Sequence, residues 1–376
     1  MTVNRKPAEV FPAGDYLLSE LEKRGWNQTE FAEIIDRPSR VISEILAGKR
    51  GITPETAKAI AAALGTSAEL WMKLDAAYQL SLVAPVSDRI AKEAKLREKF
   101  PVREMVKRGW IEGTKNYEIM ETRILDFFGK LESIDEIPQL SHAARRNYDE
   151  EVSMIQYAWL FRVKQLANAL KLPPYDEKKL RASLSDLEFL MSDPEEVRHV
   201  PKILSECGVK FVIAEPIPGS KINGVCMWDN NDSPVIGLTL KGEYIDRFWF
   251  NLRHEIEHVL RGDGKDGTLI IDEFDPTADS NKIHERERAA DEAAKNFCVP
   301  DEKMTNFIVR HDPLYTEESL KGFSLLMKRH PGIVAGQLQR RLAKWTLFKK
   351  YQVKVRQILI QTALTDGYGV VPPINL

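Results

Sequence analysis

The sequence predicts an α+β protein that is mainly helical and contains one small β-sheet. Three observations lead to this class. Residues 13–80 carry apolar side chains at helical spacing, interrupted by capping residues. Around 207–240 the pattern changes to short apolar runs separated by turn residues. After residue 243 the helical spacing returns. Because the chain has 376 residues, we expect two or three domains rather than a single core.

The first 80 residues predict five short helices. The first helix runs from Gly14 to Arg24 and stops at Gly25, and Asn27 caps a second that begins at Gln28. Pro38-Ser39 opens a third, which ends at Gly48. Thr53-Pro54 opens a fourth and Thr66-Ser67 a fifth.

Helices two and three, joined by a short turn at Asp36-Arg37, fit a helix-turn-helix. The second helix of that motif enters the major groove of DNA and presents its first residues to base edges. Those residues are Ser39, Arg40 and Ser43, whereas Gln28, Arg37, Lys49 and Arg50 are placed to bind phosphates. Residues 1–80 hold ten Lys/Arg and eleven Asp/Glu, so binding depends on this local cluster, doubled by dimerisation. The alternative is a helical bundle that contacts only proteins.

A resemblance favours the DNA-binding alternative. Residues 12–80 resemble the Xre-type helix-turn-helix domain of the HigA-like antitoxins, nearly without interruption. The stretches that carry the likeness are Pro12–Leu17, Gly25–Ala32, Arg37–Ile45, Gly48–Thr56 and Leu64–Ser67 with Trp71. The resemblance implies binding to a double-stranded DNA operator as a homodimer, and a cognate toxin as partner.

Beyond residue 80, four segments differ in pattern. Residues 81–200 predict helices separated by joints at Pro85, Pro101, Pro138 and Pro173-Pro174. Strands are predicted at Val209–Ile213, Val225–Trp228 and Val235–Leu238, with turns at Gly219 and Gly224 and at 229–232. The expected domains are therefore 1–80 (helix-turn-helix), 81–200 (helical linker), 201–310 (the strands and the helices after them) and 311–376 (a basic helical region ending in a loose Pro372-Pro373).

Two segments beyond residue 80 are strongly basic. From Arg89 to Arg108 there are eight Lys/Arg against three Asp/Glu, and from Ser319 to Thr365 ten Lys/Arg and no Asp or Glu. A one-signed segment favours an acidic partner, either nucleic acid or the chain's own acidic regions. The alternative is a solvated helix face.

Bulk properties exclude several classes of protein. A net charge of −2 and a hydrophobic content of 43% are ordinary for a globular chain. No apolar run approaches about eighteen residues, so no membrane partner is expected. The segment Met1–Pro7 lacks an apolar signal core, which predicts a cytoplasmic protein. Three widely spaced cysteines (Cys207, Cys226 and Cys298) favour neither a disulfide framework nor a cysteine-based zinc site.

The pentapeptide His254-Glu255-Ile256-Glu257-His258 lies within an apolar run. Residues four apart share a helix face, so both imidazoles reach one metal ion, Zn²⁺, and Glu255 lies beside them as a base. A pair of imidazoles with ordinary structural partners is the alternative, although two histidines and a glutamate are costly to bury unpaired.

A zinc site of this kind needs a third protein ligand. The predicted helix Glu285–Phe297 offers Glu287, with Asp291 four residues later on the same face. Glu287 would bind the metal and Asp291 would accept a hydrogen bond from a ligand imidazole. His284 is a rival ligand that lies off this face. The alternative for Glu287 is a surface ion pair with Arg253, Arg286 or Arg288.

A second resemblance covers about 200–300 and, more loosely, 140–340: the ImmA/IrrE family of metallopeptidases. It is carried by Gly208–Val212, Ile222–Gly224, Pro234–Leu238, Phe248–Phe250 with His254–His258, and Glu287–Ala294 ending at Pro300. Pro331–Leu338 resembles a C-terminal segment found where this domain is fused to a helix-turn-helix. The family pattern implies a zincin-like metallopeptidase domain at 201–310, with His254, His258 and Glu287 as zinc ligands and Glu255 as catalytic base.

This sequence departs from the ImmA/IrrE pattern at three positions. Glu257 stands where the family usually has a small residue, which places an extra carboxylate near the site. Ala289 and Ala293 replace the commoner Glu and Phe of the second helix.

The sequence therefore predicts a DNA-binding regulator of the antitoxin type with a zinc-dependent metalloendopeptidase domain that cleaves or senses a regulatory protein. Zinc would polarise a scissile carbonyl, and Glu255 would take a proton from the attacking water and pass it to the leaving amine. One alternative is a non-catalytic antitoxin or autorepressor that neutralises a cognate toxin and uses the zinc domain as sensor or binding module. The other is a peptidase whose N-terminal helices dock proteins only.

Overall fold

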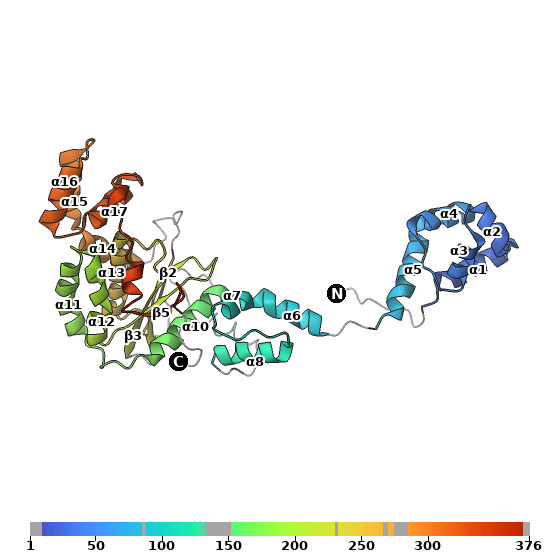
Figure 1. Cartoon of the computed structure of the whole chain (residues 1–376), viewed down its shortest axis with the longest axis horizontal. Coiled ribbons are helices and arrows are strands. Elements are labelled where there is room, and N and C mark those ends of the chain that lie inside the picture. Colours follow the sequence, from blue (N-terminus) through green and yellow to red (C-terminus); the bar gives the residue numbers. More distant parts are fainter. Residues whose placement is uncertain are drawn as a thin grey trace. The chain divides into compact units, whose positions relative to one another are not determined.

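A computed structural model describes residues 10–84, 88–129, 131, 152–229, 232–265, 270–273 and 285–370. The chain divides into two compact units, Met1–Ile90 and Ala91–Leu376 (Figure 1). The joints predicted at Pro85 and Pro138, the rival ligand His284 and the chain end at Pro372-Pro373 lie outside the described residues.

The five helices predicted in the N-terminal unit are confirmed. They are α1 (Ala13–Arg24), α2 (Gln28–Ile34), α3 (Ser39–Leu46), α4 (Pro54–Leu64) and α5 (Ala68–Leu82). The Asn27 side chain accepts hydrogen bonds from the backbone N–H groups of Thr29 and Glu30, and Thr53 and Ser67 cap α4 and α5. Their inward faces meet in one core that includes Leu17, Phe31 and Trp71.

The second unit is also mainly helical. Its helices are α6 (Asp88–Lys99), α7 (Val102–Lys107), α8 (Tyr117–Phe127), α10 (Met154–Ala169), α11 (Glu177–Leu190), η1 (Pro194–His199), α12 (Val200–Glu206), α13 (Ile245–Arg261), α14 (Glu285–Cys298), α15 (Asp301–His311), α16 (Glu317–Met327), α17 (Pro331–Leu342), η3 (Lys349–Tyr351) and α18 (Arg356–Leu359). The helical character predicted for 81–200 is confirmed for the described part of that segment.

A mixed five-stranded sheet lies in the middle of this unit. The strands are β1 (Lys210–Ala214), β2 (Ile222–Asp229), β3 (Ser233–Leu238), β4 (Ile270–Glu273) and β5 (Leu364–Asp366), in the order β4-β2-β3-β1-β5. β1 pairs in parallel with β3 and β5, whereas β2 is antiparallel to β3 and β4. The three predicted strands are thus confirmed.

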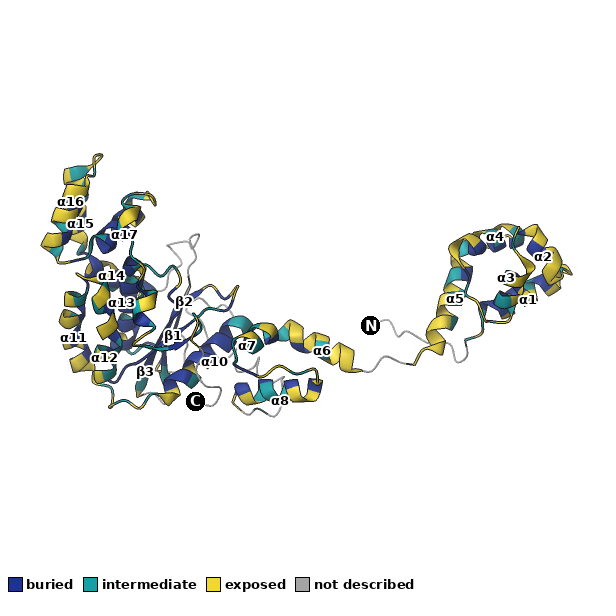
Figure 2. Ribbon diagram, in the orientation of Figure 1, coloured by how far each residue is buried: buried dark blue, intermediate teal, exposed yellow. Residues whose placement is uncertain are grey.

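Alternating side chains place an apolar core on each face of the sheet. Val212, Val225 and Val235 pack toward α10 in one core. The neighbouring residues Cys226 and Ile236 pack into a second core with α13. This alternation is the period of two that a strand buried on both faces requires. The strands β1 and β3 are accordingly almost wholly buried (Figure 2).

The strands β4 and β5 were not predicted, and they change the domain picture. β5 is contributed by the segment expected to be a separate basic helical region, yet it pairs with β1. Arg162 of α10 forms a buried ion pair with Asp366 at the end of β5. Residues 91–200, 201–310 and 311–376 therefore belong to one compact unit, since the sheet draws its strands and its covering helices from all three segments.

The chain's own carboxylates account for much of the basic C-terminal segment. Six of its ten Lys/Arg form internal ion pairs: Arg329–Glu188, Arg340–Asp246, Arg341–Asp301, Lys350–Glu317, Lys354–Glu243 and Arg356–Glu243. An acidic macromolecular partner is not needed to explain this charge. In the described residues, no helix is long and apolar enough to cross a membrane. Cys207, Cys226 and Cys298 are free thiols and buried.

Candidate metal centre and candidate nucleic-acid interface

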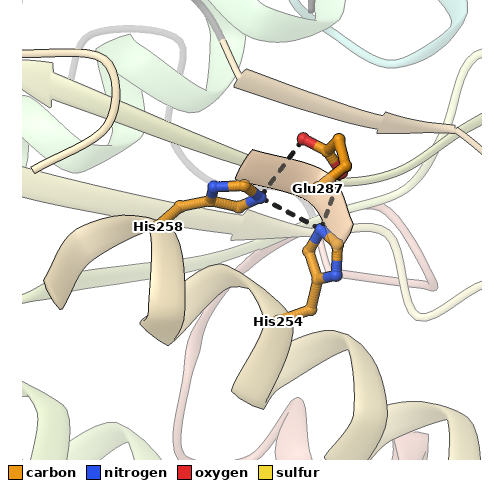
Figure 3. A group of neighbouring side chains, drawn as sticks. All are labelled: His254, His258 and Glu287. Carbon is orange, nitrogen blue, oxygen red and sulfur yellow. Dashed lines mark hydrogen bonds and ion pairs between the residues drawn. The ribbon is translucent and has the colours of Figure 1, made fainter. Parts of the chain in front are cut away.

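The helices α13 and α14 bring the predicted metal ligands together. His254 and His258 lie one turn apart on α13, and Glu287 lies in the first turn of α14. All three residues are buried. Figure 3 shows the two imidazoles and the carboxylate pointing toward one another. The two helices run antiparallel here, because His258 contacts Glu287 whereas His254 also contacts Asp291, one turn further along α14.

The distances between the three candidate ligands suit a small tetrahedral ion. The Nε2 atoms of His254 and His258 are 3.1 Å apart. The Glu287 carboxylate lies 3.1 Å from Nε2 of His254 and 3.3 Å from Nε2 of His258. A tetrahedron with zinc–ligand bonds of about 2.0–2.1 Å has edges of about 3.3 Å. These residues therefore fit Zn²⁺ with one position left for water or substrate.

A carboxylate supports each imidazole from behind. Nδ1 of His254 lies 3.1 Å from Oδ1 of Asp291, and Nδ1 of His258 lies 3.0 Å from Oδ2 of Asp263. A hydrogen bond donated from Nδ1 leaves Nε2 with the lone pair that binds a metal. The structure thus places Asp291 where the sequence predicted it and adds Asp263, which the sequence reasoning missed.

The end of α13 explains how Asp263 reaches His258. Gly262 adopts a left-handed conformation with φ of 71°, and the Asp263 N–H donates to the carbonyl of His258. The turn folds Asp263 back over the imidazole. The backbone carbonyl of Asp263 also accepts a hydrogen bond from Nε1 of Trp228, which connects the turn to β2. The Gly262-Asp263 pair, four and five residues after His258, was the available sequence signal.

The mutual contacts shift the pKa values of two ligands strongly. Burial would lower the pKa of His258, but the Asp263 and Glu287 carboxylates outweigh it and raise that pKa to about 9. Burial would raise the pKa of Glu287, but hydrogen bonds from His254 and His258 lower it to about 2. Without a metal, an imidazolium between two carboxylates thus takes the place of the cation.

Glu255 is fully buried beside the metal ligands. A Cβ atom added to Gly224 of β2 would lie 2.3 Å from Oε1 of Glu255. Glycine at position 224 therefore leaves the space that the Glu255 carboxylate fills. The turn predicted at Gly224 is wrong, because this glycine lies inside β2 and pairs with Leu238, and its missing side chain has this packing role instead.

Glu257 lies next to His258 in the chain, but its carboxylate pairs with another residue of α13. Its Oε2 lies 2.8 Å from Nη2 of Arg253, one turn back on α13. Positions 253 and 257 share a helix face that differs from the face of His254 and His258, because each residue turns about 100° around the axis. Glu287 is buried, and its carboxylate contacts both imidazoles.

Asp263→Asn should weaken zinc binding about 10- to 100-fold, because loss of the carboxylate behind a ligand imidazole has effects of this size. Asp291→Asn should cost less, since the Asp291 side chain is 33% exposed and that of Asp263 only 8%. Competition with a chromogenic chelator measures both affinities. Equal zinc affinity in wild type and Asp263→Asn would contradict the positioning role.

The metal-free protein should lose stability as pH rises from about 6.5 to 9. The pKa of His258 is raised from 6.5 to about 9. The contribution of protonated His258 to the free energy of unfolding is therefore complete below pH 6.5 and lost as pH passes 9. The contribution of Glu287, whose pKa is lowered from 4.5 to about 2, is present above 4.5 and lost as pH falls toward 2. Urea unfolding at pH 6 and pH 9 should differ by on the order of 3 kcal/mol. His258→Gln should remove most of this difference in unfolding free energy. The zinc affinity of the wild-type protein should rise between pH 6 and pH 9, because the metal binds the deprotonated imidazole.

In the N-terminal unit, α2 and α3 form the predicted helix-turn-helix. Six of the seven predicted DNA-contacting residues are exposed: Gln28, Ser39, Arg40, Ser43, Lys49 and Arg50. Arg37 is half-buried. Ser39, Arg40 and Ser43 lie on the outer side of α3, whose inner side buries Ile42 and Ile45 in the core. The three predicted base contacts are thus accessible on one helix.

Comparison with known proteins identifies this domain. Residues 17–71 match the family model described as Helix-turn-helix, so the N-terminal unit contains a helix-turn-helix domain. Virulence-associated protein A of Dichelobacter nodosus is 44% identical over 66 residues, which cover 17% of this chain and 65% of that protein. The chain thus spans less than two thirds of the length of this relative.

Two further matches are similarly confined in extent. An uncharacterized HTH-type transcriptional regulator, YddM, of Escherichia coli (strain K12) is 29% identical over 68 residues, covering 18% of this chain and 72% of that protein. The solved structure of an addiction module antidote protein of a HigA family from Coxiella burnetii matches with 25% identity and a TM-score of 0.19. The match covers 24% of this chain and 95% of the chain in that solved structure. The matched family model ends at residue 71, so it does not extend to the candidate metal centre.

Proposed function

We propose that the protein is a DNA-binding transcriptional regulator of the antitoxin type that binds its operator as a homodimer. The observation that carries this proposal is the helix-turn-helix at residues 17–71 with Ser39, Arg40 and Ser43 exposed on α3. A relative of this domain is described as an HTH-type transcriptional regulator. Arginine and serine at the start of a recognition helix read base edges in the major groove.

The double variant Ser39→Ala/Arg40→Gln should bind a selected DNA duplex at least 10-fold more weakly, since each good base contact is worth about 1–3 kcal/mol. The duplex is one that the wild-type protein enriches from a random pool, and a gel-shift titration at low salt measures the affinity. Lys73→Gln, which removes a positive charge from the exposed side of α5, is the control. No duplex binding by the wild-type protein would leave only protein docking for these helices.

We further propose that Ala91–Leu376 carries a zinc centre of the metallopeptidase type, with His254, His258 and Glu287 as ligands. The compact ligand triangle and the carboxylate behind each imidazole support this. Bound zinc would supply a Lewis acid for a carbonyl oxygen and would acidify a water molecule. Glu255, one position from His254 on α13, would accept a proton and deliver it to the leaving amine. The substrate would be a regulatory protein.

The second candidate is a non-catalytic antitoxin or autorepressor that binds a cognate toxin, with the zinc centre as sensor or binding module. The full burial of Glu255 favours it, because the base must be reached by substrate. Under this alternative, Glu255→Gln leaves repression and toxin neutralisation unchanged, whereas Ser39→Ala/Arg40→Gln abolishes repression. Zinc content of the purified protein beside His254→Ala/His258→Ala tests the site in both cases, and equal zinc in the two would refute it.

A further inference from the structure

One carboxylate holds two of the predicted DNA-contacting arginines. Oε1 of Glu44 accepts a hydrogen bond from Nε of Arg40 at 2.8 Å, and Oε2 accepts one from Nη1 of Arg50 at 3.1 Å. Arg40 lies in α3, and Arg50 lies in the turn after that helix. The Arg40 side chain is 87% exposed and that of Glu44 only 27%, so the arginine extends outward from the carboxylate that anchors it.

The backbone of Glu44 fixes the same turn. Its carbonyl accepts hydrogen bonds from the N–H groups of Lys49 at 2.9 Å and Arg50 at 3.2 Å. Gly48 has a φ of 66°, which lets the chain reverse at the end of α3. The side chain and the carbonyl of Glu44 together define where Lys49 and Arg50 stand relative to the recognition helix.

The charge of Glu44 also matters for DNA binding. The hydrogen bonds from Arg40 and Arg50 hold the pKa of Glu44 below its usual value, so the carboxylate is ionised at neutral pH. A phosphate that binds either guanidinium must compete with it. Because residues 1–80 hold no excess of positive charge, each neutralised arginine is a large part of the attraction to DNA.

We propose that Glu44 is a positioning residue that sets the sequence selectivity of the helix-turn-helix. Its carboxylate holds the Arg40 and Arg50 side chains in one arrangement. The same carboxylate competes with DNA phosphates for both guanidinium groups, so phosphates that do not fit this arrangement are bound more weakly. The inference rests on the proposed DNA binding and names a residue, Glu44, that was not among the predicted contacts. Sequence-independent affinity comes mainly from phosphate contacts, so lowering it raises the ratio of specific to non-specific binding.

Glu44→Gln tests this, because it keeps the shape of the side chain and removes its charge. The probes are a pool of short duplexes with a randomised centre and the duplex that the wild-type protein enriches from that pool, at one fixed salt concentration. Affinity for the pool should rise about 3- to 10-fold, as expected when two exposed ion pairs are lost. The ratio of enriched-duplex to pool affinity should fall by at least as much. The matched control is Glu69→Gln on α5, an exposed glutamate with the same change of charge.

A double-mutant cycle shows whether Glu44 acts through the arginines. In the Arg40→Gln/Arg50→Gln background, Glu44→Gln should change neither affinity. The proposal is overturned if Glu44→Gln leaves pool affinity unchanged, if Glu69→Gln has the same effect, or if the effect persists without the two arginines. Circular dichroism verifies that each variant is folded. If the wild-type protein binds no duplex, the proposed function falls with the inference, whereas binding with an unresponsive cycle refutes the inference alone.

Discussion

Glu255→Gln is expected to lower peptide hydrolysis by about 10²–10⁴-fold while one zinc ion stays bound per chain. A positioned general base contributes a factor of this size, and glutamine cannot accept the proton. The three ligand side chains are untouched, so the metal content should match that of wild type. The rate is measured by mass spectrometry with a random peptide library, and zinc by elemental analysis of the same samples.

The comparison separates catalysis from metal loss. His258→Ala should lose both zinc and hydrolysis, whereas Glu255→Gln should lose only hydrolysis. Zinc-loaded wild type that cleaves nothing, with Glu255→Gln indistinguishable from it in repression, would favour the sensor alternative. Equal rates for wild type and Glu255→Gln would refute the role of Glu255 as base.

Gly224→Ala is expected to displace the Glu255 carboxylate and to impair hydrolysis nearly as severely as Glu255→Gln. The new Cβ would lie 2.3 Å from Oε1 of Glu255 and 3.0 Å from Cδ2 of Leu238. Glu255 is fully buried, so its carboxylate has little room to retreat. Overpacking of this kind also costs about 1–3 kcal/mol in the free energy of unfolding. Urea unfolding, zinc content and the peptide assay measure the three consequences.

Gly237→Ala on β3 is the matched control. Its Cβ would lie 2.8 Å from Val163 and 2.9 Å from Val225, so it strains the same sheet without meeting Glu255. We expect a comparable loss of stability and normal hydrolysis per folded molecule. If the two variants lose hydrolysis equally, general strain explains the result and the specific space for Glu255 does not.

Local pattern predicted the elements whose contacts are short-range. Three of the five N-terminal helices begin at the capping residues Asn27, Thr53 and Ser67, which act on backbone groups two or three residues away. β5 escaped prediction because three residues carry no period, and its stability comes from pairing with β1, which lies about 150 residues earlier in the chain. We predicted a separate C-terminal region for the same reason, because its long-range pairing with β1 leaves no local pattern.

Local pattern likewise predicted only some residues of the candidate metal centre. Helical spacing alone predicted that His254 and His258 share a face, and that Glu287 and Asp291 share another. The zinc itself and the roles of these residues remain predictions. Asp263 belongs to the group because a left-handed glycine folds the chain back, whereas Glu257 pairs with Arg253 on another face of α13.

The sequence by itself determined the helix-turn-helix, the mainly helical class and the residue types of the candidate metal centre, because capping, helical spacing and ligand chemistry act over a few residues. Only the tertiary structure decided which glycine makes room for Glu255. It also decided that the C-terminal segment completes the central sheet. These outcomes depend on packing between segments that are far apart in the chain. No local sequence pattern shows which of these segments come into contact.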